Sequence, residues 1–112
     1  MLTHEFGIVT IITRLKDHDS IHAPRDYDCI AVNDDYILPI LDDLRILKTY
    51  WDSLDRLESG LAYHGTTFIP PESLAEFQGI LLKSSYREKL TDLVSLISKA
   101  ISKNNYMIHF GL

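Results

Sequence analysis

The chain has five histidines, which could act in acid–base chemistry or bind a metal because imidazole titrates near neutral pH and is a common metal ligand. His18 and His22 stand four residues apart, which is the spacing of two metal ligands on one helical face. However, the residues around them lack apolar periodicity, and no glutamate follows the first histidine. We therefore interpret this pair as a surface feature and expect no metal site.

His64 and His109 suggest a second kind of chemistry, since both fall in segments that we expect to form strands. On neighbouring strands, two imidazoles could divide the general base and general acid roles of phosphodiester cleavage. The tripeptide that begins at His64 matches the His-x-Thr motif of two-histidine phosphoesterases, but the one that begins at His109 does not. The sequence favours structural histidines and leaves a small histidine-dependent phosphodiesterase or hydrolase as an alternative.

Carboxylates are concentrated in one part of the chain. Between Asp17 and Glu58 there are eleven acids and four bases, a net charge of −7, whereas the whole chain has −5. This asymmetry argues against a nucleic-acid partner and permits a cationic one, although the acids could also simply keep one face soluble. The pairs at 34–35 and 42–43 flank an apolar stripe, so we expect them to point outward and to bind Lys or Arg.

Other catalytic signatures are absent from the sequence. There is no glycine-rich phosphate loop, no serine elbow and no basic surface interleaved with aromatic residues. We therefore expect a binding protein rather than an enzyme, with aromatic residues among its anchors. The candidate partner-binding residues are Asp34, Asp35, Asp42, Asp43, Trp51, Asp52, Asp55 and Tyr63.

The chain has 112 residues, of which 46% are hydrophobic and 24% charged, as is typical of one globular domain. We expect a single domain over residues 1–112. No apolar run reaches the roughly 20 residues that cross a bilayer, and residues 1–7 lack the pattern of a signal peptide. Cys29 is the one cysteine, which excludes an intrachain disulfide and fits a reducing compartment. We expect a cytoplasmic protein with no cofactor and no membrane partner.

The hydrophobic pattern predicts four strands and a first long helix. Apolar runs rich in β-branched or aromatic residues predict strands at Phe6–Ile12, Tyr27–Val32, Leu61–Ile69 and Tyr106–Phe110. Apolar residues that recur every three or four positions from Ile37 to Leu54 predict the helix. The segment from Arg14 to Asp26 has no periodicity and predicts a loop.

Two further helices are predicted from capping boxes. Ser73 with Glu76, and Ser85 with Glu88, each match the pattern in which two side chains satisfy free N–H groups of a first turn. Apolar stripes follow both, the second one running from Leu90 to Ile101. The order of elements predicts an α+β fold, with three helices packed on one face of a mixed sheet of about four strands.

Four blocks of the sequence also carry a resemblance. YDCIAVNDD (27–35), LKTYWDS (47–53), GLAYHGTTFIPPESL (60–74) and YMIHFG (106–111) together resemble an uncharacterised family of small bacterial proteins. The similarity covers nearly the whole chain from His4 and is weakest between Arg14 and Asp26. Members of that family look like immunity proteins, which protect a cell against polymorphic toxins delivered by contact.

The resemblance implies a protein-binding role and supplies no site residues. We expect a monomer that forms a heterodimer with a cognate toxin domain, and the acidic segment favours a cationic toxin such as a nuclease. A regulatory adaptor that binds another cellular protein is a further alternative, which only the identity of the partner would separate from immunity.

Overall fold

The computed structural model describes residues 1–10 and 23–112, so Asp17, His18, Asp19 and His22 lie outside the described residues. The strands are β1 (Thr3–Val9), β2 (Ile30–Asn33), β3 (Lys48–Trp51), β4 (Leu57–Ser59), β5 (Thr66–Ile69) and β6 (Tyr106–Phe110). The α-helices are α1 (Asp34–Ile37), α2 (Pro71–Lys83) and α3 (Thr91–Ser102). Short 3₁₀ helices are η2 (Pro24–Asp26), η3 (Leu38–Ile40), η4 (Asp43–Ile46) and η5 (Arg87–Leu90).

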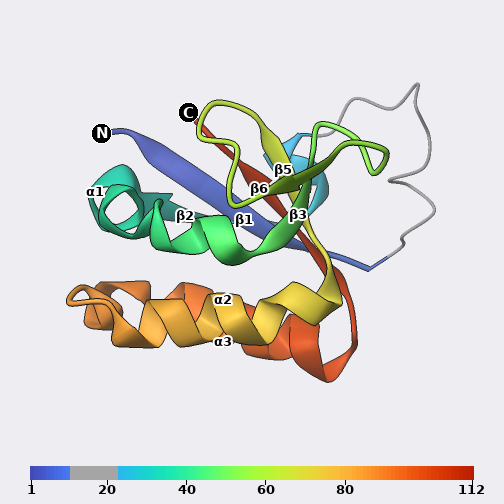
Figure 1. Cartoon of the computed structure of the whole chain (residues 1–112). Helices are drawn as coiled ribbons and strands as arrows, with labels where there is room; N and C mark the ends of the chain where they lie inside the picture. The colour runs from blue at the N-terminus through green and yellow to red at the C-terminus, as the bar shows by residue number, and fades with distance from the viewer. Residues whose placement is uncertain (11–22) are drawn as a thin grey trace.

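All six strands of the described residues form one sheet, in the order β2-β1-β6-β5-β3-β4. Every neighbouring pair is antiparallel. The predicted α+β class is confirmed, whereas the prediction of a mixed sheet of about four strands is wrong. Because β1 and β6 are neighbours, the N-terminus and the C-terminus lie at the same end of the sheet (Figure 1).

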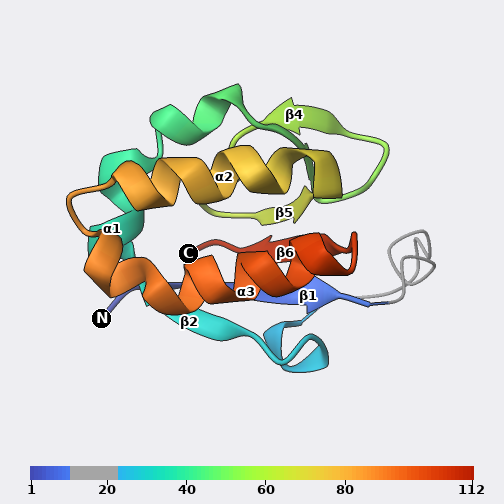
Figure 2. The same ribbon diagram turned by 90° about the horizontal axis from the view of Figure 1, so that it is seen from below.

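The main core lies between the sheet and the two long helices. Figures 1 and 2 show α2 and α3 side by side along one side of the sheet. Phe6, Ile69 and Met107 from the strands are fully buried against residues such as Phe77 and Ile97 from the helices. Apolar burial on this scale is the main favourable contribution to folding.

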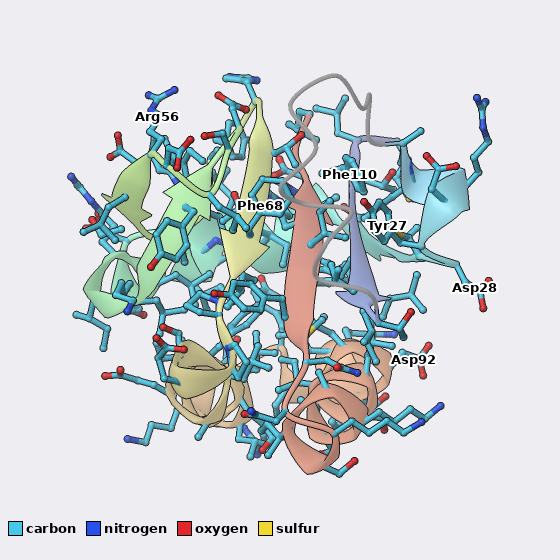
Figure 3. The ribbon with its side chains drawn as sticks, turned by 90° about the vertical axis from the view of Figure 1, so that its right-hand side faces the viewer. Tyr27, Asp28, Arg56, Phe68, Asp92 and Phe110 are labelled. Carbon is cyan, nitrogen blue, oxygen red and sulfur yellow. The ribbon has the colours of Figure 1, made fainter. Side chains whose placement is uncertain are left out.

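The opposite side of the sheet carries a smaller, more aromatic cluster. Val9, Tyr27, Phe68 and Ile108 are buried in it, and Tyr50, Tyr106, Phe110 and Cys29 are partly buried beside them. In Figure 3, the labelled Tyr27, Phe68 and Phe110 lie away from the helix layer that carries Asp92. The half-buried Cys29 thiol has its pKa raised to about 11, first by burial and then by the charges of Glu5 and Asp28, so it stays protonated at neutral pH.

The predicted helix from Ile37 to Leu54 is wrong over most of its length. The segment forms α1, η3 and η4, and then the strand β3. Its apolar spacing is still satisfied, because Ile37, Ile40, Leu44 and Leu47 are all buried on one side of these short turns. Pro39 lies within η3, where the missing N–H of proline limits a continuous helix.

The other helices and strands are present with shifted boundaries. α2 begins at Pro71, so Ser73 lies inside its first turn, and the Ser73 hydroxyl donates to the carbonyl of Lys48 at 2.7 Å instead of capping the helix. The second predicted capping box falls in the turn before α3, which begins only at Thr91. β6 has the predicted bounds, and β5 covers the last part of its predicted range. β1 begins before its predicted range, whose last two residues lie outside the described part of the chain, and β2 begins and ends later than predicted.

None of the helices in the described part of the chain combines the length and the apolar character that a membrane span requires.

Candidate functional site

A chain of hydrogen-bonded polar side chains lies on the face of the sheet that packs against the helices. The Tyr63 hydroxyl donates to Asp34 Oδ2 at 2.8 Å, and the other carboxylate oxygen, Oδ1, lies 2.8 Å from His4 Nε2. His4 Nδ1 is 2.8 Å from His109 Nε2, and His109 Nδ1 is 3.2 Å from the hydroxyl of Thr67. We call these five residues the polar chain.

The sheet register brings the polar chain together. His109 pairs with Phe6 on β1 and with Thr67 on β5, so these three side chains share one face of the sheet. His4 lies two residues before Phe6 and therefore points to the same face. Asp34 reaches it from α1, directly after β2, because its backbone N–H bonds to the Leu2 carbonyl at 2.9 Å.

The donors and acceptors of the polar chain are mutually consistent. The Asp34 carboxylate can only accept, so His4 Nε2 donates to it. Of the two facing nitrogens, His4 Nδ1 and His109 Nε2, one donates to the other, and the Thr67 hydroxyl can donate to or accept from His109 Nδ1. The Thr67 oxygen also accepts from the backbone N–H of Ala62 at 2.8 Å. Ala62 precedes Tyr63, which is the residue at the other end of the polar chain. No buried side-chain nitrogen or oxygen of the described residues lacks a partner.

Burial and hydrogen bonds determine the charges of His109 and Asp34. Desolvation lowers the pKa of His109 to about 3, with a smaller contribution from the charge of His4, so His109 is neutral above that pH. The hydrogen bond from His4, followed by that from Tyr63, holds the pKa of the Asp34 carboxyl below its usual range. Asp34 therefore stays ionised and its two donors stay in place.

The structure separates the two histidines of the catalytic alternative. His109 is buried with an exposed fraction of 0%, and both of its ring nitrogens are hydrogen-bonded inside the protein. The prediction that His64 lies in a strand is wrong. It lies in an exposed turn before β5, where its ring contacts Tyr63. A substrate between these two imidazoles would require the fold to open. The histidine that does contact His109 is His4, which the sequence reasoning did not single out.

Four of the six candidate partner-binding acids fall into three groups. Asp34 does not point outward, as expected, but is 8% exposed and belongs to the polar chain. Asp52 is exposed but accepts from Arg56 at 3.2 Å and from the backbone N–H of Thr66 at 3.3 Å. Asp35 and Asp43 are exposed and form no ion pair with any described residue.

The segment from Leu38 to Ile46, which comprises η3 and η4, forms an exposed surface that we call the acidic ridge. Leu38 and Ile46 are large apolar residues that are 54% and 66% exposed. Asp42 and Asp43 lie between them, and Asp42 makes only a long contact of 3.5 Å with Arg45, which is itself largely exposed. Single exposed apolar residues are common, so the ridge is a candidate binding surface because these two lie beside acids that are unpaired or weakly paired.

Hollows lie on both sides of the acidic ridge, and Asp42 lines both. One of about 450 Å³ reaches Trp51 and Glu58. The other, of about 490 Å³, reaches α2, where Ile80 and Lys83 line it. The structure therefore brings Asp42, Asp43 and Trp51 to one region of the surface. Trp51 is half-buried, and its indole N–H donates to the carbonyl of Gly60 at 2.9 Å.

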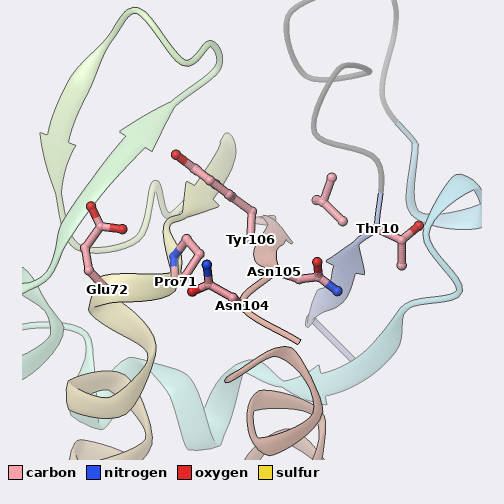
Figure 4. A pocket seen from close by; sticks show the side chains of 7 residues that line it. Thr10, Pro71, Glu72, Asn104, Asn105 and Tyr106 are labelled. Atoms are coloured by element: carbon pink, nitrogen blue, oxygen red, sulfur yellow. The ribbon is translucent and has the colours of Figure 1, made fainter. Parts of the chain in front are cut away.

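The remaining candidates lie apart from the ridge. Tyr63 is half-buried and oriented by Asp34, and Asp55 is exposed in the turn between β3 and β4. A further hollow of about 460 Å³, shown in Figure 4, is lined by Glu72, Asn104, Asn105 and Tyr106 among others. Glu72 is paired there with Lys48 at 2.8 Å, so this hollow has no unpaired carboxylate.

No cluster of three or more His, Cys, Asp or Glu side chains that could hold a metal ion occurs in residues 1–10 and 23–112. Comparisons with known protein families, with curated proteins and with solved structures give no match to this chain.

Proposed function

We propose that this protein is an immunity protein that binds a toxin domain and neutralises it by electrostatic and steric blocking. The observation that carries the proposal is the acidic ridge, where Leu38 and Ile46 are exposed beside Asp42 and Asp43. A partner of complementary chemistry has a basic surface with apolar side chains, as a nuclease toxin that binds phosphates would have. The resemblance of the sequence to immunity proteins supports the same function.

A binding role is also supported by the burial and the hydrogen bonding of the titratable groups. His4, Asp34 and His109 are the most closely associated set of such groups, and they are hydrogen-bonded to one another below the surface. Asp35 and Asp43, in contrast, are exposed and form no ion pair with any described residue. We place the partner contact on Asp42, Asp43 and Trp51, and expect a one-to-one complex in the cytoplasm.

If a large secreted protein is encoded directly upstream of this chain, its C-terminal domain is the toxin candidate that the test uses. Co-expression should restore the growth of cells that produce this domain, and calorimetry should show a one-to-one complex of the purified proteins. Growth arrest that persists despite equal expression of both proteins, together with an absence of binding, would sink the proposal.

Charge reversal then tests the ridge itself. Asp42→Lys with Asp43→Lys should slow association at low salt and reduce its salt dependence, because long-range steering is lost. Glu88→Lys with Asp92→Lys is the matched control, since it changes the net charge equally on the exposed surface of η5 and α3. Equal effects of the two double variants would show that the overall charge, and not the ridge, attracts the partner.

A further inference from the structure

β2 is an edge strand whose outer backbone groups have no partner among residues 1–10 and 23–112. It pairs with β1 alone, as the outermost strand on its side of the sheet (Figure 2). Hydrogen-bonded and non-hydrogen-bonded residue pairs alternate along an antiparallel ladder. Because Asp34 N–H bonds to the Leu2 carbonyl, Val32 and Ile30 are the residues of β2 whose backbone groups bond to β1. Ala31 and Asn33 therefore direct their N–H groups away from the sheet, and no described residue accepts from them.

This edge lacks the features that usually prevent pairing with another chain. Exposed edge strands are commonly protected by charged residues, proline, a bulge or extreme shortness. β2 has the sequence Ile-Ala-Val-Asn, without a charge or a proline, and Ala31 is exposed. The opposite edge, β4, is three residues long and carries Glu58, which is paired with Arg56 at 3.2 Å. β2 is one residue longer than β4, and the edges differ mainly in that β4 carries a charged residue within the strand and β2 does not.

The charges around β2 define what it can bind. Asp28 precedes the strand, Asp35 follows it, and both are exposed, while Arg25 is the exposed base nearest to them in sequence. If two copies paired through β2 in antiparallel orientation, Asp28 of each copy would lie close to Asp35 of the other. Like charges facing each other across strands are destabilising, so a second copy is a poor occupant. An extended segment with Lys or Arg at both ends is complementary.

We propose that β2 binds an extended, uncharged segment of a partner protein, with basic residues at both ends of that segment, by addition of a strand to the sheet. Main-chain hydrogen bonds to Ala31 and Asn33 would provide affinity, and Asp28 and Asp35 would select the basic ends. This deepens the proposed function, since it rests on the chain being a binder of a cationic protein, and it adds a contact distinct from the acidic ridge.

The test selects peptides from a displayed library of random twelve-residue sequences on the wild-type protein. Enriched peptides should carry two bases that flank an uncharged stretch rich in β-branched residues, and their synthetic forms should protect the Ala31 and Asn33 amides from hydrogen exchange. Ala31→Pro should weaken binding by at least about tenfold, because it removes the outward N–H without breaking a bond to β1. Leu57→Pro, the same change on the outer side of β4, is the matched control and should bind normally.

A second variant guards against misfolding of Ala31→Pro. Asp28→Asn with Asp35→Lys keeps every main-chain N–H and a residue type that tolerates the positive φ of 52° at position 28, and it should weaken the same peptides while it favours acidic ones. Peptides that bind these variants and the wild type equally, or a selection that enriches none, would overturn strand addition. A dimer in sedimentation that Ala31→Pro dissociates would assign the edge to a second copy instead. Toxin binding that persists without peptide binding would overturn only this inference, whereas peptide binding without toxin binding would overturn the proposed function.

Discussion

His4 and His109, which are separated by 105 positions in the sequence, place their ring nitrogens Nδ1 and Nε2 2.8 Å apart in the middle of the sheet. Their rings are stacked, with centroids 5.1 Å apart and an interplanar angle of 19°. The pair joins the first strand to the last, and Asp34 and Thr67 hold its two ends. The buried contact between the two termini of the chain is thus polar as well as apolar, and its cost of desolvation is offset only while every member is bonded.

His109→Ala should therefore destabilise the fold more than an ordinary truncation. The change leaves a cavity and removes a partner from both His4 and Thr67, so we expect a loss of about 2–4 kcal/mol in the free energy of unfolding. Urea denaturation would measure it. His64→Ala is the control, because His64 is exposed, and it should change stability by no more than about 0.5 kcal/mol. Similar losses for the two variants would contradict the structural role of His109.

Acidification should destabilise the wild type through His109. The folded state binds a proton there only near pH 3, whereas the unfolded chain binds one near pH 6.5. The unfolded state therefore gains a proton first, and this contribution to stability is complete above pH 6.5 and declines as the pH falls towards 3. The slope attributable to one such group is at most about 1.4 kcal/mol per pH unit.

His109→Gln isolates this effect because glutamine does not titrate. Between about pH 6.5 and pH 4, the stability of this variant should depend less steeply on pH than that of the wild type. The difference in slope corresponds to at most one fewer proton bound on unfolding. Asp34, whose pKa is lowered, loses its contribution at lower pH, as the pH falls through its folded value. Parallel pH profiles for the two proteins would rule out a buried neutral His109.

Asp34 and Asp43 should have opposite roles although both are acids of the same segment. Asp34→Asn removes the charge that accepts from His4 and Tyr63, so the protein should lose about 1–3 kcal/mol of stability and bind its partner normally once folded. Asp43→Asn should leave stability nearly unchanged and weaken partner binding. Urea denaturation and calorimetry distinguish the two. The reverse pattern would mean that the ridge is not the contact surface.

Parts of this fold can be predicted from the sequence because they depend on local pattern. β6 and the body of α3 follow from residue type and spacing within one element. β3 cannot be separated from a helix in this way, since Leu44 and Leu47 continue the stripe of Ile37 and Ile40 although the backbone has left the helical path. The alternation of Leu47, Thr49 and Trp51 is the available strand signal.

The polar chain depends on strand order, which no local pattern contains. His109 is a candidate from its residue type, yet its partner can be identified only once β1 is known to lie beside β6. The alternation of His4, Phe6 and Ile8 could have placed His4 on the core side of its strand. Residue type alone assigns Asp34 to the surface, because acids usually lie there. Asp34 is buried instead because the buried imidazole of His4 donates a hydrogen bond to it.

Two glycines should respond in opposite ways to alanine. A Cβ on Gly111 would clash with the Tyr63 carbonyl oxygen and would lie 2.6 Å from that of Ala62, so the C-terminal segment could no longer lie against the loop that carries Tyr63. We expect Gly111→Ala to lower the melting temperature. Gly79 lies inside α2, and no atom lies within 4 Å of the place that an added methyl group would occupy, so Gly79→Ala should stabilise the helix by about 0.5–1 kcal/mol. Thermal unfolding of both variants beside the wild type measures the difference, and a Gly111→Ala protein as stable as the wild type would refute the close approach of the two segments.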